Sequence, residues 1–169
     1  MNLIDLAQPP ALVTTPLEVN TTLANRLIQV LCRRTRNNPL LYTKANDSAL
    51  NLVHWIGQQL FAGTVPEVLL GKRLLTINPL LLTETLPPVQ FEALLAELIA
   101  ESISSKAIAF IANINLIRSS LGFGNIQPEL ARGRLQILAT AKYNVESDYR
   151  QVDSDWAFRR FQGLSLIHI

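Results

Sequence analysis

The sequence predicts one α/β domain in which helices flank a parallel sheet. Short, almost uninterrupted apolar runs alternate along the chain with longer segments whose apolar residues recur at helical spacing. Strands that are apolar on both faces are typical of a parallel sheet that helices cover on both sides. The chain has 169 residues, of which 49% are hydrophobic and 17% charged, which allows one well-buried core.

The first half of the chain shows this alternation clearly. Residues 21–34 carry apolar side chains at helical spacing behind two threonines that can cap a helix, and they end in basic residues. The run 39–42 is apolar, as expected of a buried strand. Helical spacing returns at Asp47 or Ser48, either of which can cap a second helix, and a turn follows at Gly63.

The second half continues the alternation. The runs 73–77 and 107–111 are expected to be strands, and residues 89–102 between them have the apolar spacing of a helix. A glycine-containing connection at 121–125 then leads to a fourth strand at 135–140. The remainder of the chain is expected to be mainly helical.

Charge and composition argue against several classes of function. The formal net charge is +2 and the Lys and Arg residues are scattered along the sequence, so we expect no nucleic-acid partner. The longest apolar runs fall far short of the roughly 20 residues that a membrane-crossing helix needs. The first residues lack the basic start of a signal peptide. The single cysteine, Cys32, cannot form an internal disulfide, and we expect a cytoplasmic protein with no membrane partner.

Four stretches resemble, in the same order, motifs of the first ATPase module of Clp-type AAA+ unfoldases. Residues 33–41 (RRTRNNPLL) are similar to RRTKNNPVL, and residues 63–74 keep the glycine, VPE and GKRL positions of the segment that follows in the family. Residues 130–136 (LARGRLQ) resemble LARGELQ, and residues 157–162 (AFRRFQ) resemble LERRFQ. The resemblance spans 21–162 and implies the P-loop NTPase fold of an AAA+ large subdomain, of ClpB-like, ClpC-like or ClpV-like type.

The resemblance implies a phosphate loop, GEPGVGKT in the family, at residues 43–50. Such a loop needs glycines so that backbone N–H groups can surround the phosphates, a lysine for the outer phosphates and a hydroxyl for magnesium. In this register the three glycine positions, the lysine position and the hydroxyl position hold Thr43, Asn46, Ser48, Ala49 and Leu50. Lys44 is the nearest basic residue, and without neighbouring glycines it is expected to lie in a solvated loop.

The other catalytic motifs that the resemblance implies are also altered. The family's ILFIDEIH carries an aspartate for magnesium and a glutamate that activates water, and these positions hold Ala112 and Asn113. An asparagine cannot accept a proton from water. The polar sensor position holds Lys142, and the aromatic pore position holds Pro87 or Pro88. Although the family is an ATPase, we predict an inactive chain that binds no ATP, magnesium or other metal.

One functional element implied by the resemblance is retained. Arg159 and Arg160 correspond to the arginine pair that reaches the ATP site of the neighbouring subunit in Clp rings. Guanidinium groups supplied in this way stabilise the charge on the transferred phosphoryl group. An alternative role for the pair is in surface ion pairs at a helix end. The partners that the resemblance implies are other AAA+ or Clp subunits, in a ring or a hetero-oligomer.

Three segments are expected along the chain. Residues 1–20 form an N-terminal arm, and residues 21–162 form a degenerate AAA+ large subdomain. Residues 163–169 fit no predicted element and are expected to be the translation of a sequencing adapter or a tail. The leading hypothesis is a Clp-like module that acts by protein contact. Two alternatives stay open: the first part of an ATP-driven chaperone, unfoldase or type VI secretion ATPase whose activity lies in a second module, or a decaying paralogue without function.

Overall fold

The fold was analysed in a computed structural model, which describes residues 1–8, 19–44, 46–114, 120–142 and 164–169. In chain order the elements are β1 (Leu3–Asp5), α1 (Thr21–Leu31), β2 (Asn38–Thr43), α2 (Asn46–Ala62), the 3₁₀ helix η1 (Glu67–Leu69), β3 (Leu74–Ile77), the 3₁₀ helix η2 (Pro79–Leu81), α3 (Pro88–Ser105), β4 (Ile108–Ile111), α4 (Ser120–Ala131), β5 (Gln136–Lys142) and β6 (Leu164–His168). Within the described residues, every helix is too short or too polar to span a bilayer.

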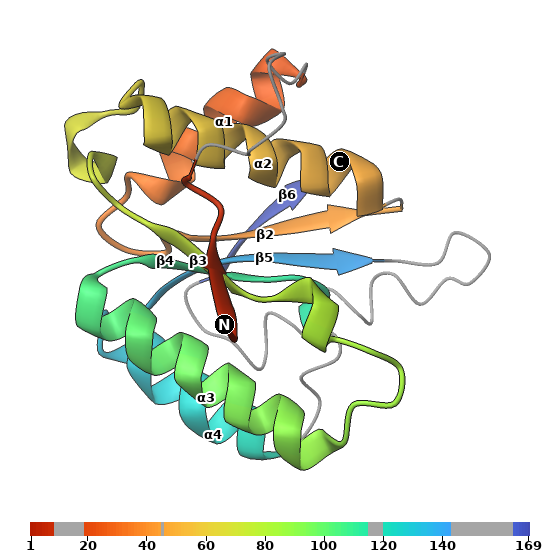
Figure 1. The fold of residues 1–169 in the computed structure, drawn as a ribbon. Helices are drawn as coiled ribbons and strands as arrows, with labels where there is room; N and C mark the ends of the chain where they lie inside the picture. The colour runs from red at the N-terminus through yellow and green to blue at the C-terminus, as the bar shows by residue number, and fades with distance from the viewer. Residues whose placement is uncertain (9–18, 45, 115–119, 143–163) are drawn as a thin grey trace.

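The strands form one six-stranded sheet in the order β1-β3-β4-β5-β2-β6 (Figure 1). Neighbouring strands from β3 to β6 are parallel, whereas β1 pairs with β3 in the antiparallel direction. Helices α1 and α2 lie on one face of the sheet, and α3 and α4 lie on the other (Figure 1). The predicted fold class, a parallel sheet flanked by helices, is confirmed, with β1 as an antiparallel addition at one edge.

Successive side chains of the strands enter two different cores, which explains the uninterrupted apolar runs. In β2, Leu40 and Tyr42 belong to the core formed with α3 and α4, whereas Leu41 belongs to the core formed with α1 and α2. None of the three is more than 1% exposed. Because both faces of the strand are buried, no polar residue alternates with the apolar ones.

The helices and strands predicted in the first half of the chain are present, with differences at their ends. The N-cap of α1 is Asn20, whose side-chain oxygen accepts a hydrogen bond from the Leu23 N–H at 3.2 Å, so the prediction of a threonine cap is wrong. The helix α2 already begins at Asn46, so both residues predicted to cap it lie inside its first turn. The second difference shortens the connection from β2.

The prediction of a connection at 121–125 is wrong, because these residues lie inside α4. The segment contains Gly122, Gly124 and Pro128, which are unfavourable in a helix. Buried side chains of α4, Ile126 and Leu130, pack in the same core as α3. Tertiary packing therefore overrides local propensity in this segment.

The C-terminal expectation is also partly wrong. Residues 164–168, expected to fit no element, form β6 and pair with β2 in parallel. Leu164 and Ile167 are buried, with 4% and 1% exposure, which gives the strand an anchor in each core. Residues 143–163, expected to be mainly helical, lie outside the described residues. The origin of 163–169 in a sequencing adapter stays a prediction.

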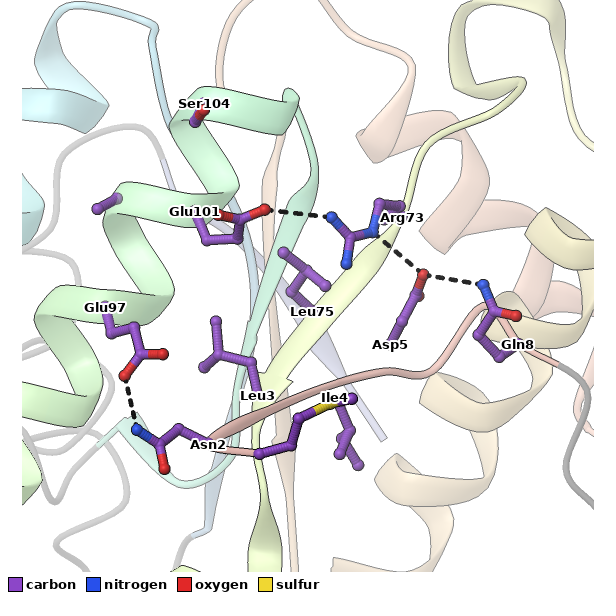
Figure 2. A pocket seen from close by; sticks show the side chains of 12 residues that line it. Asn2, Leu3, Ile4, Asp5, Gln8, Arg73, Leu75, Glu97, Glu101 and Ser104 are labelled. Atoms are coloured by element: carbon purple, nitrogen blue, oxygen red, sulfur yellow. Dashed lines mark hydrogen bonds and ion pairs between the residues drawn. The ribbon is translucent and has the colours of Figure 1, made fainter.

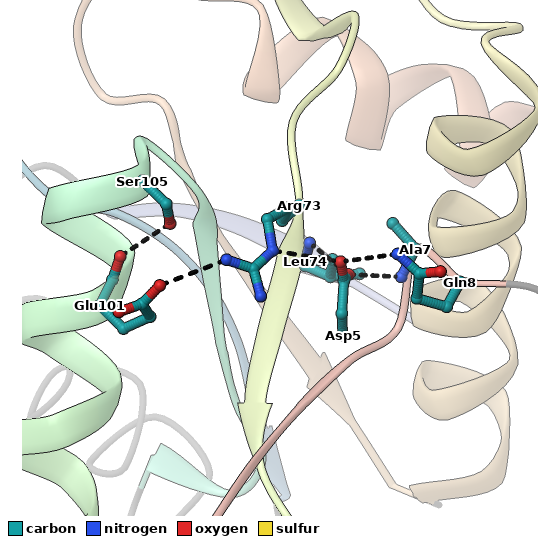
Figure 3. Close-up of polar contacts among 7 residues, drawn as sticks. All are labelled: Asp5, Ala7, Gln8, Arg73, Leu74, Glu101 and Ser105. Atoms are coloured by element: carbon teal, nitrogen blue, oxygen red, sulfur yellow. Dashed lines mark hydrogen bonds and ion pairs between the residues drawn. The ribbon is translucent and has the colours of Figure 1, made fainter.

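The N-terminal arm contributes β1, a strand that the sequence analysis does not predict, and Asp5 fixes this strand to the sheet (Figure 3). One carboxylate oxygen of Asp5 accepts hydrogen bonds from the backbone N–H groups of Ala7 and Leu74, at 2.8 and 3.1 Å. The other accepts from Arg73 Nε at 3.3 Å and Gln8 Nε2 at 3.4 Å. A single side chain therefore joins the arm to the start of β3.

Candidate functional site

The positions that the sequence singles out gather at the carboxyl edge of the sheet. Strands β4, β5 and β2 are neighbours. Strands β2 and β5 end at the same level, with Thr43 opposite Lys142, whereas β4 ends at Ile111 opposite Ala139, three residues before the end of β5. In open α/β sheets, ligands bind outside the carboxyl ends of parallel strands. The structure thus brings together the end of β2, the residues after β4 and the end of β5.

The connection from β2 to α2 is short. The strand ends at Thr43 and the helix begins at Asn46, so two residues lie between them. A phosphate loop needs a longer glycine-rich turn between strand and helix, so that several backbone N–H groups converge on one phosphate. Here the residues of that turn form the first turn of a helix.

The side chains at the lysine and hydroxyl positions face the protein interior. Ala49 is 0% exposed and belongs to the core formed with α1 and α2. Leu50 is partly buried and packs against the same core. Lys44, by contrast, is exposed immediately after β2. Helix α2 contains no lysine, so none of its side chains can reach a phosphate as the lysine of a phosphate loop does.

The residues after β4 are fixed by a contact with β5 that the sequence analysis misses. Asn113 has a positive φ of 56°, and its backbone N–H donates a hydrogen bond to the Thr140 hydroxyl at 2.8 Å. Thr140 is 5% exposed, whereas Ala112 is exposed. A threonine within the apolar run of β5 is the sequence signal that points to this contact.

The remaining predicted positions lie in different places. Pro87 is the N-cap of α3 and Pro88 its first residue, where a proline is favoured because no N–H is needed. The backbone of Lys142 pairs with β2 at the carboxyl edge. Arg159 and Arg160 lie outside the described residues.

A hollow lies near the β1 edge of the sheet, between β1, β3 and α3 (Figure 2). Its volume is about 790 Å³, and its charged side chains are engaged in polar contacts within the hollow. Arg73 is 3.3 Å from both Asp5 and Glu101, and Asn2 donates to Glu97 at 2.9 Å. Arg73 is thus shared between two carboxylates, and Glu97 accepts a hydrogen bond from a neutral amide.

Metal ligands and thiols are further kinds of site that the described residues could form. No cluster of three or more metal-ligating side chains occurs among them. Cys32 follows α1, and burial raises the pKa of its thiol, which keeps the thiol in its unreactive protonated form at neutral pH. His54 is exposed on α2.

No protein-family model matches the chain, whereas curated proteins are similar to it over most of its length. The chain is 33% identical over 148 residues to chaperone protein ClpB of Meiothermus ruber, covering 81% of this chain and 17% of that protein. It is 33% identical over 147 residues to the ATP-dependent Clp protease ATP-binding subunit ClpE of Bacillus subtilis, covering 81% and 21%. The chain thus spans about a fifth of the length of these curated relatives.

Solved structures are similar to this chain in fold. The S. cerevisiae Hsp104–ADP complex superposes with a TM-score of 0.75 at 22% identity, covering 99% of this chain and 30% of that one. A complex of Hsp104 with ATPγS and FITC casein superposes with a TM-score of 0.76 at 23% identity. At this level of identity the likeness establishes the arrangement of helices and strands.

Proposed function

We propose that the chain acts by protein contact without hydrolysing ATP. The premise is that the chain is homologous to the Clp ATPase family over about four fifths of its length, as part of an AAA+ module. The contact is made in or against a ring of competent AAA+ subunits. One observation supports this proposal most directly: the connection from β2 to α2 has two residues, and the helix that follows presents Ala49 to the core.

The physical argument concerns the charge of the nucleotide. A triphosphate with several negative charges is held by convergent donors, and without them its desolvation is not compensated. Ala49 has no donor, and Leu50 has an apolar side chain packed against the core. Asn113 cannot accept a proton, so a bound nucleotide would lack the base that activates water. The chain therefore lacks both the donors that would hold a nucleotide and the base that would activate water for its hydrolysis.

The first test is nucleotide binding. We expect a fluorescently labelled ATP analogue to show no saturable binding to the chain at low micromolar concentration, in the presence of magnesium, by fluorescence anisotropy. The Lys44→Ala variant should give the same trace, because the exposed Lys44 has no glycine loop around it. Binding that excess unlabelled ATP abolishes would contradict the proposal, and its loss in Lys44→Ala would identify Lys44 as the contact.

The second test concerns the arginine pair. We expect the chain to associate with a competent Clp ATPase, such as the Meiothermus ruber ClpB, and to change its rate of ATP hydrolysis. Replacement of both Arg159 and Arg160 by alanine should abolish the rate change, because the guanidinium groups no longer reach the neighbouring site. Far-ultraviolet circular dichroism should show that this variant stays folded.

The matched control replaces Arg33 and Arg34, a consecutive exposed pair that precedes β2. This control removes the same charge and should leave the effect on the partner unchanged. If both double variants lost the effect on the partner's rate of ATP hydrolysis equally, the effect would be due to net charge and not to the arginine pair. The absence of any association, measured by size-exclusion chromatography with light scattering, would refute the proposed contact.

The coverage of the relatives favours a second candidate function. Because the chain spans about a fifth of their length, it could be a structural part of a ClpB-like or ClpV-like ATPase whose activity lies in another module. The test is to read the genomic DNA downstream of this open reading frame. A phosphate loop with its glycines and lysine in the same frame would support this candidate, and an in-frame stop without one would exclude it.

A further inference from the structure

The parallel topology gathers basic residues that are scattered along the sequence. The strands β2, β3, β4 and β5 all begin at one edge of the sheet, opposite the edge described above, and basic residues precede each of them. These residues, eight of the 15 lysines and arginines in the chain, are Arg33, Arg34, Arg36, Lys72, Arg73, Lys106, Arg132 and Arg134. The edge is therefore positively charged in the fold, although the sequence shows no basic run of this size.

Part of this charge has an ordinary structural explanation. Helices α1, α3 and α4 end at this edge, and cations are favoured at the negative end of a helix dipole. Arg73 is also paired with Asp5 and Glu101. The dipole does not explain Lys72 and Arg134, because neither directly follows a helix end.

Lys72 and Arg134 meet Lys106 in a pocket of about 390 Å³. Its other polar side chains are the amides of Asn37 and Gln136, and no acidic side chain lines it. Lys106 has no ion pair among the described residues. Arg134 has an acidic neighbour, Glu129 at 3.6 Å, which lies outside the lining. The pocket thus holds three cations against no anion of its own.

The ammonium group of Lys72 is held in a fixed position. Both N–H bonds of the Gln136 amide are used, because Nε2 donates to the carbonyl oxygens of Leu31 and Asn37, each at 3.0 Å. Oε1 of Gln136 then accepts from Lys72 Nζ at 3.2 Å. Gln136 is only 8% exposed, so this arrangement is rigid, and a lysine ammonium with one donor used retains two others.

The positive charges of the pocket repel one another when no anion is bound. Burial, and in addition the positive charge of Lys106, lower the pKa of Lys72. Lys106 itself is the C-cap of α3 in the left-handed region, at φ 53° and ψ 38°, a conformation that glycine adopts most readily. Arg134 stands where the resembled motif LARGELQ has a glutamate. Two positions thus place a cation where a glycine or an acid would be expected.

We propose that this pocket binds a phosphate group, held by Lys72, Lys106 and Arg134. A multiply charged oxyanion compensates the charges of Lys72 and Lys106, and the guanidinium of Arg134, whose Nε faces Glu129, can still donate from its two terminal nitrogens to phosphate oxygens. The backbone N–H groups of Lys106, Gly133 and Arg134 already donate to main-chain carbonyl oxygens, so the side chains provide the donors. The volume also leaves room for an organic group attached to the phosphate.

The test is a titration of the full chain with inorganic phosphate and, separately, with O-phosphoserine, followed by NMR of labelled lysine and arginine side chains. We expect saturable shifts at Lys72, Lys106 and Arg134 and an upward shift of the Lys72 pKa when the anion is bound. Tighter binding of O-phosphoserine would identify a phosphate ester as the ligand, and equal binding would identify the free anion.

The variants separate a specific pocket from general charge. Arg134→Glu should weaken binding about tenfold or more, since it removes a charge-assisted donor and adds repulsion. Lys106→Asn should also weaken it, and because asparagine tolerates the left-handed conformation, this variant should stay folded. Arg26→Glu makes the same charge change as Arg134→Glu at an exposed position of α1 outside the pocket, and should change affinity less than twofold.

Two results would overturn the proposal. One is the absence of saturable shifts at these three residues with either ligand up to millimolar concentration. The other is an equal loss of affinity in Arg134→Glu and Arg26→Glu, which would indicate non-specific attraction to a basic protein. Neither result bears on ATP binding at the opposite edge, so this test is independent of the proposed function.

Discussion

Replacement of Gly57 by alanine is expected to lower the free energy of unfolding and to detach β1 from the sheet. Gly57 lies in α2, where its backbone closely approaches that of Leu6. A Cβ atom at this position would overlap the carbonyl oxygen of Leu6 and lie 3.1 Å from its carbonyl carbon. Because the obstructing atoms are backbone, no side-chain rotation relieves the overlap.

Two effects of opposite sign compete in this variant. Alanine in place of glycine inside a helix is favourable by about 1 kcal/mol when nothing opposes it. Overpacking of a close contact costs about 1–3 kcal/mol, and here the segment after β1 must also move. We expect the second effect to dominate, with a net loss of about 1–2 kcal/mol in urea denaturation.

The position of the damage is measurable separately from its size. The Leu6 N–H donates to the Leu74 carbonyl at 2.8 Å, and this amide should lose its protection from hydrogen exchange in Gly57→Ala. His54→Ala is the matched control, because His54 is exposed on the same helix and its replacement creates no overlap. A Gly57→Ala protein as stable as the wild type, with Leu6 still protected, would contradict the close approach.

The central strands could be predicted from the sequence because burial on both faces leaves a local signal. In β2, β4 and β5 nearly every residue is buried, so each strand appears as an apolar run with polar residues or turns on either side. The same holds for α2 and α3, whose apolar spacing has a helical period. These elements are found with ends displaced by a few residues.

The elements that were not predicted, β1 and α4, depend on long-range interactions. β1 has three residues, too few for any periodicity, and exists because it pairs with β3 some 70 residues later. The glycines and proline of α4 suggest a loop, and only packing against α3 makes a helix. Local sequence carries no record of either interaction.

In the candidate sites, too, some features could be predicted from local sequence and others depend on long-range interactions. The resemblance locates Ala49, Asn113 and Lys142, and parallel strands in register then bring their segments to one edge. The early start of α2 is a property of the whole fold and could not be predicted. The basic pocket could not be predicted either, because Lys72, Lys106 and Arg134 lie about 30 residues apart and meet only through the sheet topology.

Replacement of Asp5 by alanine is expected to destabilise the protein by about 2 kcal/mol, since charged hydrogen bonds to backbone donors are lost near a buried strand. The N–H of Leu74 would be left without its acceptor next to a side chain that is 0% exposed. The Asp5 side chain is 10% exposed, whereas Arg73 is 46% exposed, so solvent screens their ion pair. The backbone donors, not the ion pair, should account for most of the loss.

Two further variants separate these contributions. Asp5→Asn keeps an oxygen for the N–H groups of Ala7 and Leu74 but turns its amide toward Arg73 and Gln8, which are donors themselves, and should cost about 1 kcal/mol. Arg73→Gln removes only the exposed ion pairs with Asp5 and Glu101, and should cost less than about 1 kcal/mol.

The order of the three losses in urea denaturation decides which interaction anchors β1. If Arg73→Gln were as damaging as Asp5→Ala, the ion pair would be the anchor, and 0.5 M salt, at which the Debye length falls to about 4 Å, should then weaken the wild type. If the backbone donors are the anchor, salt should change stability little. Asp5→Ala should also expose the Leu6 amide to exchange as Gly57→Ala does, because both substitutions release the same segment from opposite sides. Their combined effect should therefore be smaller than the sum of the single effects.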